Sequence, residues 1–161
     1  MASSDTRPST SGHQSMESCW ISVWRLLMPP KVDIFLRRAC KNWIPTRVNL
    51  VRRKIPVGAI YPICNRYQET IMHALWGCLN MEEVRKQCGF VKGLRSETSV
   101  DFKAFLAFCS QNLHGNELPL FSNILWRIWF LQNQKIHGTS ELSISNVYSW
   151  SYDFFILLLG S

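Results

Sequence analysis

The sequence predicts an all-α fold: a small helical domain that carries one irregular Cys/His loop resembling a zinc knuckle. Three observations lead to this class. Apolar residues recur at helical spacing along most of the chain, the alternation typical of strands is scarce, and prolines and glycines separate the periodic segments. With 47% hydrophobic residues among 161, the chain can also bury a substantial core.

Three helices are expected before the loop. The first covers about 20–27 and stops at two consecutive prolines. The second covers 31–43 and is amphipathic, with an apolar face and a basic outer face, and Pro45 ends it. Thr46 is a suitable N-cap for a short third helix over 47–54.

The rest of the chain predicts four more helices, over 81–87, 100–113, 120–138 and 144–159. The pattern is strongest over 120–138, where an apolar stripe runs to Gly138, a natural stop signal. The final segment is apolar on several sides, so we expect it to pack across the other helices.

Composition divides the chain into three parts. Residues 1–18 are rich in Ser and Thr and are expected to form a disordered tail. A polar break over 93–99 is a plausible seam, so that 19–92 forms the region with the Cys/His loop and 93–161 a helical region packing on it.

The chain is not expected to meet a membrane or to be secreted. Its longest apolar run, at 154–159, is far shorter than the ~20 residues of a membrane span. The N-terminus lacks the apolar core of a secretory signal, so we expect a nuclear or cytoplasmic protein. Its six cysteines should then be buried thiols or metal ligands.

Positive charge is concentrated in one segment. The chain carries a net charge of +7, and residues 31–54 alone hold eight basic residues against one acidic residue. Such a segment can neutralise the phosphates of RNA or DNA, or it can form a solvated basic face. The candidate nucleic-acid contacts are Arg37, Arg38, Lys41, Arg47, Arg52, Arg53 and Lys54.

The stretch "YPICNRYQETIMHALWGC", residues 61–78, carries an incomplete set of zinc ligands. Zinc prefers four Cys or His donors in a tetrahedron. Cys64, His73 and Cys78 are three candidates, and Tyr67 stands where a second Cys would complete a C-x-x-C pair.

The ordered motifs "PPKV.IFL.RAC", "PTRVNLVRRKIPV", "ET..HALWGC" and "LWRIWFLQNQKIHG" resemble the zinc-binding domain of plant non-LTR (LINE-type) retrotransposon reverse transcriptases. The resemblance covers roughly residues 20–138. It implies a zinc-dependent nucleic-acid-binding module, with Cys64, His73 and Cys78 matching the first, third and fourth ligands of that family.

Three marker positions depart from the family pattern. Tyr67 occupies the second ligand position, Arg37 stands where Trp is usual, and Gln132 stands where Arg is usual. A phenol is a poor zinc ligand. We therefore expect weakened or absent zinc binding, with Cys88 as an alternative fourth donor and simple packing of these residues as the other alternative.

No catalytic motif is visible. The chain lacks a P-loop, a G-x-S-x-G elbow and the spaced carboxylates of a two-metal nuclease, so a non-enzymatic protein without a small-molecule substrate is expected. Three donors plus a water would match a catalytic zinc, but no general base accompanies them. The leading hypothesis is a nucleic-acid-binding module, and the alternative is a decayed retroelement remnant with a helical core and no retained activity.

Overall fold

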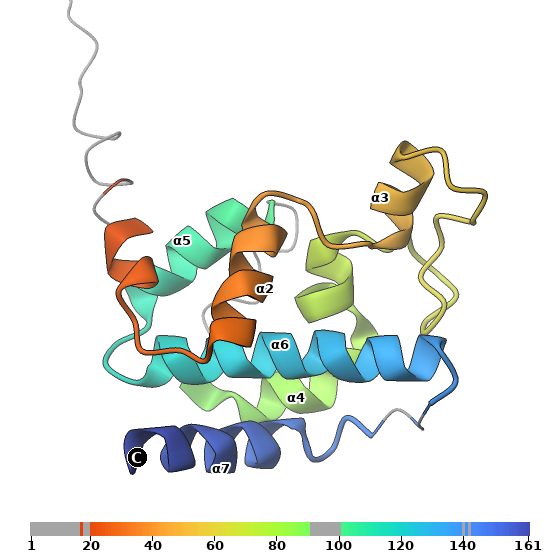
Figure 1. The fold of residues 1–161 in the computed structure, drawn as a ribbon. Helices are drawn as coiled ribbons and strands as arrows, with labels where there is room; N and C mark the ends of the chain where they lie inside the picture. Colours follow the sequence, from red (N-terminus) through yellow and green to blue (C-terminus); the bar gives the residue numbers. More distant parts are fainter. Residues whose placement is uncertain (1–16, 18–19, 91–100, 140, 142) are drawn as a thin grey trace, which may run out of the picture.

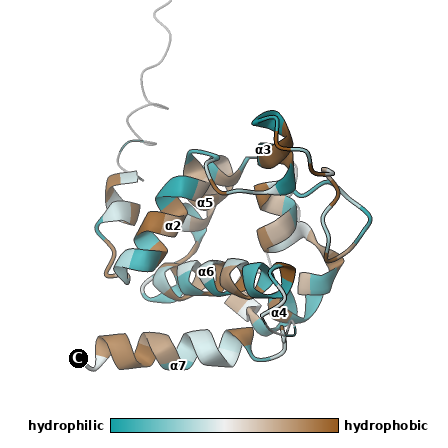
Figure 2. Ribbon diagram, turned by 45° about the vertical axis from the view of Figure 1, so that its right-hand side comes forward, coloured by the Kyte–Doolittle hydropathy of each residue, from teal (hydrophilic) through white to brown (hydrophobic). Residues whose placement is uncertain are grey.

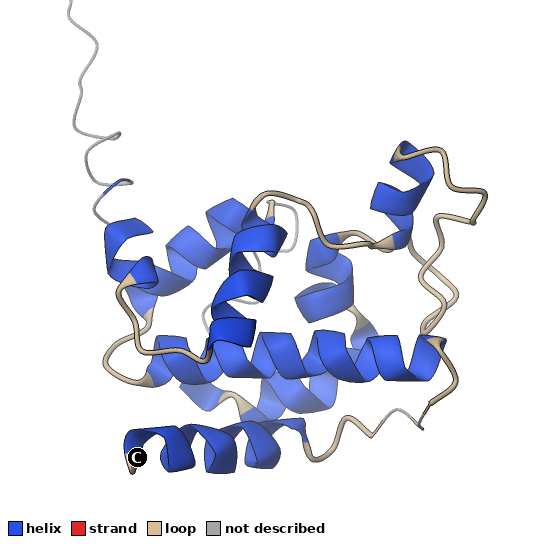
Figure 3. Cartoon of the chain, in the orientation of Figure 1, coloured by secondary structure: helices blue, strands red, loops and turns tan. Residues whose placement is uncertain are grey.

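The computed structural model describes residue 17 and residues 20–90, 101–139, 141 and 143–161. Nearly all of the expected tail, 1–18, and the expected seam at 93–99 lie outside these residues. Within the described part the secondary structure is helical (Figure 3). One isolated bridge joins Ile60 to Gln68. The predicted all-α class is confirmed.

The N-terminal helices follow the sequence pattern but end earlier than expected. A short helix covers 20–24, and α2 runs over Pro30–Cys40 with its apolar face buried. The next helix, α3, covers Arg47–Arg52. Its predicted cap is present, because the Thr46 side chain accepts a hydrogen bond from the backbone N–H of Asn49.

The central segment is made of short, tight helices. A π-helical turn, η1, covers His73–Gly77, and a 3₁₀ turn, η2, covers Leu79–Met81. The predicted helix that follows is α4, Glu82–Gln87.

Longer helices form the second half. These are α5 over Phe102–Asn112, α6 over Glu117–Ile136 and α7 over Val147–Leu159. The longest, α6, begins before the predicted start at 120 and includes Pro119 in its first turn, where a missing N–H removes no helical bond. It ends as predicted before Gly138, whose φ of +70° suits glycine.

The core is built around α6. Figure 1 shows α6 across the middle of the molecule with α7 alongside it, and α2 and η1 also pack on α6. The helix α5 packs on α2, and its Phe105 ring meets Phe121 of α6 with centroids 6.1 Å apart. Trp76 of η1 is 1% exposed and lies edge-on to Phe121, with ring centroids 5.0 Å apart. The core therefore joins residues from 19–92 and from 93–161 in one cluster.

The last helix packs by one side only. Val147, Ser151 and Phe155 are buried against the rest of the molecule, while Leu157 is 73% exposed. Figure 2 shows apolar residues along much of α7. None of the described helices combines the length and hydropathy that crossing a bilayer requires.

Candidate metal centre

A small hairpin-like loop holds the first candidate ligand. The backbone N–H of Tyr61 donates to the carbonyl of Tyr67 at 2.8 Å, and that of Glu69 donates to Ala59 at 2.9 Å. These bonds close the loop 61–67, which reverses at Asn65 with φ of +54°, a conformation that asparagine tolerates. Cys64 precedes this reversal.

The other two ligands lie at the two ends of the π-helical turn η1, because His73 begins it and Cys78 directly follows it. Its first residue, His73, donates its backbone N–H to the Thr70 hydroxyl, and its carbonyl accepts from the N–H of Cys78 at 3.0 Å. The Arg85 guanidinium donates to the carbonyls of Trp76 and Cys78 and so fixes the end of the turn.

The two segments bring Cys64, His73 and Cys78 together. Their ligand atoms all lie within 4.8 Å of one another, and Cys64 Sγ is 3.3 Å from His73 Nε2. Two sulfurs and one imidazole nitrogen are donors that zinc prefers, and ligands of a tetrahedral zinc lie about 3.5–3.8 Å apart. The three residues therefore fit a zinc ion and supply three of its four positions.

Burial shifts the pKa of His73 and that of Cys78. It lowers the pKa of His73, which favours the neutral imidazole that binds metals. Burial raises the pKa of the Cys78 thiol, while a hydrogen bond from the backbone N–H of Asn80 acts in the opposite direction. A bound zinc would therefore have to displace a proton from Cys78.

Two tyrosines flank His73 in different ways. The Tyr67 ring is 60% exposed, and its centroid lies 5.5 Å from that of the imidazole. The residue at the second ligand position is therefore a surface phenol at the edge of the site. The Tyr61 ring is fully buried, meets His73 edge-on at 5.4 Å, and its hydroxyl has no hydrogen-bond partner among the described residues. Burial, with Cys78, Glu69 and Cys64 nearby, raises the pKa of Tyr61, so this phenol stays neutral.

Cys88, the alternative fourth donor, does not join the group. It is fully buried at the end of α4, and burial raises its pKa to about 12. Such a thiol is inert at neutral pH and belongs to the core.

The acidic residue between Cys64 and His73 has a structural role. The side chain of Glu69 is 2% exposed, and its carboxylate accepts a hydrogen bond from the backbone N–H of Arg47 at 2.8 Å. This bond connects the loop to the first turn of α3, where a negatively charged group also interacts favourably with the positive end of the helix dipole.

Comparison with protein families identifies the region that contains this centre. Residues 5–84 match the family model described as zinc-binding in reverse transcriptase. The chain belongs to this family. No curated protein and no solved structure matches it significantly. The reverse-transcriptase zinc-binding match ends within α4, so the three candidate ligands all lie inside it.

The basic candidates do not share one environment. Arg38, Arg53 and Lys54 are exposed and make no ion pair within the described part of the chain. Arg52 donates to the Asn49 side chain at 3.1 Å. The remaining three are partly engaged: Arg47 is half-buried, Arg37 pairs with Asp33 at 2.9 Å, and Lys41 lies over the Trp43 ring at 4.6 Å.

The unusual residues Arg37 and Gln132 both have contacts. The Arg37 guanidinium stacks over Trp24 at 4.2 Å, in addition to its ion pair. Gln132 is fully buried in α6 and donates to the carbonyl of Ala74 in η1 at 2.7 Å. This side chain thus links the second half of the chain to the turn that carries His73.

Sequence reasoning did not single out Tyr61 or Lys103. Tyr61 lies three residues before Cys64, and Lys103 comes from α5, outside the basic segment 31–54. A tyrosine three residues before a ligand and a single lysine in another helix do not form a motif that would indicate a function. Their importance depends on tertiary contacts.

Proposed function

We propose that this chain is a non-catalytic nucleic-acid-binding module of a reverse transcriptase of the plant LINE-type retrotransposons. Zinc, held by Cys64, His73 and Cys78, would fix the loop 61–67 against η1. The basic side chains of α2, α3 and the residues that follow each helix would contact phosphates of RNA or DNA.

The observation that carries this proposal is the exposure of unpaired cations on anchored backbone. Arg53 and Lys54 directly follow α3, and this helix is held by Thr46 at its start and by Glu69 through the N–H of Arg47. Cations held on fixed backbone contact a polyanion at a smaller entropy cost than cations on a mobile tail, and each phosphate contact releases counterions.

The test is the salt dependence of binding. Fluorescence anisotropy with labelled RNA and DNA oligonucleotides should give affinities that fall steeply with salt. Replacing Arg38, Arg53 and Lys54 together by Gln should reduce the slope of log affinity against log salt by about 2, because three phosphate contacts on a single strand contribute about 0.7 each.

A matched control neutralises cations on other elements. Lys86→Gln combined with Lys135→Gln removes exposed positive charges from α4 and α6. Both are ion-paired, so this control should bind nucleic acid as the wild type does. An affinity that does not change with ionic strength, or an equal loss in the control, would reject the proposal.

A second candidate is a retroelement remnant with a stable helical core and no retained activity. The observation in its favour is Tyr67, an exposed phenol in place of the second thiolate. Purified protein with neither bound zinc nor affinity for RNA or DNA would favour this alternative.

A further inference from the structure

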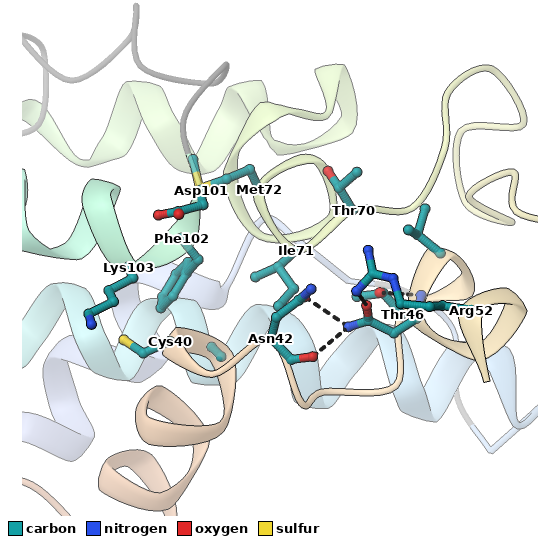
Figure 4. Close-up of a pocket in the computed structure, with 13 residues that line it drawn as sticks. Cys40, Asn42, Thr46, Arg52, Thr70, Ile71, Met72, Asp101, Phe102 and Lys103 are labelled. Atoms are coloured by element: carbon teal, nitrogen blue, oxygen red, sulfur yellow. Dashed lines mark hydrogen bonds between the residues drawn. The ribbon is translucent and has the colours of Figure 1, made fainter.

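Two neighbouring cavities lie between α2 and α5. The larger, about 430 Å³, also reaches α3 and residues 70–72, and Figure 4 shows side chains that line it. The smaller, about 220 Å³, lies between the short helix 20–24, α2 and α5. Cys40 and Lys103 line both cavities, so the two lie side by side, and together they are called the groove below.

The groove is positively charged. Arg37, Lys41 and Lys103 line its smaller part, where no acidic side chain takes part in the lining, although Arg37 is already paired with Asp33 beside it. Arg52 and Lys103 line the larger part together with Asp101, whose carboxylate is engaged as the N-cap of α5 through the N–H of Ala104 at 2.7 Å. The groove therefore favours an anion.

Aromatic rings accompany these cations. Trp20 and Trp24 stack with centroids 5.9 Å apart, and Lys103 lies 5.5 Å from the centre of the Trp20 ring. Trp43 follows Lys41 and Asn42, which line the smaller and larger cavity respectively, and it is 58% exposed. An exposed indole beside a basic groove is the arrangement that single-strand-binding proteins use to stack bases.

We propose that this groove binds a single-stranded polynucleotide, with phosphates on Lys41, Lys103 and Arg52 and an unpaired base against Trp43. The inference rests on the proposed nucleic-acid binding and names its site and the form of its ligand. Concave spaces of this volume admit nucleotide-sized groups, whereas a duplex presents its backbone on a rigid convex surface and keeps its base faces stacked.

The central test is Lys103→Gln in the full chain, because Lys103 lies outside the basic segment that the sequence indicated and borders both cavities. Binding to a labelled single-stranded oligonucleotide should weaken, and the salt slope should fall by about 0.7. Trp43→Ala should weaken binding about tenfold with little change in that slope, because it removes stacking and no charge. Both residues are exposed, and thermal unfolding checks that each variant folds.

Lys86→Gln, on α4, is the matched charge control and should bind as the wild type does. RNA and DNA strands of the same sequence separate the two possible sources of the ligand, and either one binding through Lys103 and Trp43 supports the site. An unlabelled duplex of equal length should compete poorly, and equal competition would overturn the single-strand assignment.

The failure of this inference can be told apart from failure of the proposed function. If Lys103→Gln and Trp43→Ala bind normally while the triple variant of Arg38, Arg53 and Lys54 does not, nucleic acid binds elsewhere and the groove is rejected. If the wild type binds no nucleic acid, both proposals fail.

Discussion

At the scale of single residues, the metal centre depends on what borders His73. Cys64 and Cys78 reach it from the loop and from the end of η1, while Tyr67 presents its ring from the second ligand position. A site with three protein donors leaves its fourth zinc position to water and so binds more weakly than a closed structural site. We therefore expect the identity of residue 67 to control the affinity for zinc.

Tyr67→Cys should raise the affinity for zinc by about a hundredfold, roughly one quarter of the free energy of a four-ligand structural site. It should also raise the melting temperature in the presence of zinc. Competition against a chromophoric chelator measures the affinity. Tyr67→Ala removes the same ring without adding a thiol, and equal affinities of the two variants would contradict the prediction.

Zinc affinity should also rise with pH. Because the pKa of Cys78 is raised by burial, the metal-free thiol is protonated at neutral pH and each zinc bound through it releases that proton. His73 adds no proton release there, since its pKa is lowered and the ring is already neutral. Chelator competition between about pH 6.5 and 8 should show at least a tenfold rise per pH unit. A flat profile would show that zinc does not bind through Cys78.

At the scale of elements, α3 is held by a network of polar contacts around one buried residue. The Asn49 side-chain amide donates to the carbonyls of Asn42 and Ile44 and to the side chain of Asn42, at 2.9–3.0 Å. It also accepts from Arg52. This network connects the end of α2 to α3 and so sets the shape of the larger cavity in Figure 4.

Asn49→Ala should destabilise the fold by about 2–3 kcal/mol, because it leaves buried carbonyls without donors. Chemical denaturation followed by circular dichroism measures the change. The control is Asn80→Ala, whose exposed side chain makes one hydrogen bond of 3.3 Å to Ile63 and should cost less than about 0.5 kcal/mol. Equal effects of the two substitutions would contradict the assigned role of Asn49.

At the scale of the whole molecule, the family match and the folding unit differ in extent. The match ends at residue 84, yet Trp76 inside it packs on Phe105 and Phe121 outside it. The bond from Gln132 to Ala74 spans the same division. The region that carries the candidate ligands therefore depends on α5 and α6 for its core.

A fragment of residues 1–92 should consequently lack a cooperative unfolding transition. It retains every candidate zinc ligand but loses the apolar partners of Trp76 and the donor to Ala74. Differential scanning calorimetry of the fragment and of the full chain, both with zinc, makes the comparison. A sharp transition in the fragment would show that 19–92 folds alone.

Much of this architecture could be predicted from local patterns. Helical periodicity identified α2, α5, α6 and α7, and Thr46 and Gly138 marked a helix start and a helix stop. Spacing and family resemblance identified the three candidate ligands. Three features depend on tertiary contacts and could not be predicted from the sequence. These are the groove between α2 and α5, the exposure of Trp43, and the separate environments of the basic residues.

His73 and Cys78 are five residues apart, a separation that a regular α-helix would not bring to one face. In an α-helix successive residues rotate by about 100°, so residues five apart point roughly 140° away from each other. The bond from the Cys78 N–H to the His73 carbonyl closes a wider ring and brings these residues onto one side. Transplanting the site onto a regular helix thus requires deleting one residue between them. In a relative whose His and Cys are four residues apart in this segment, we therefore expect an ordinary α-helical turn.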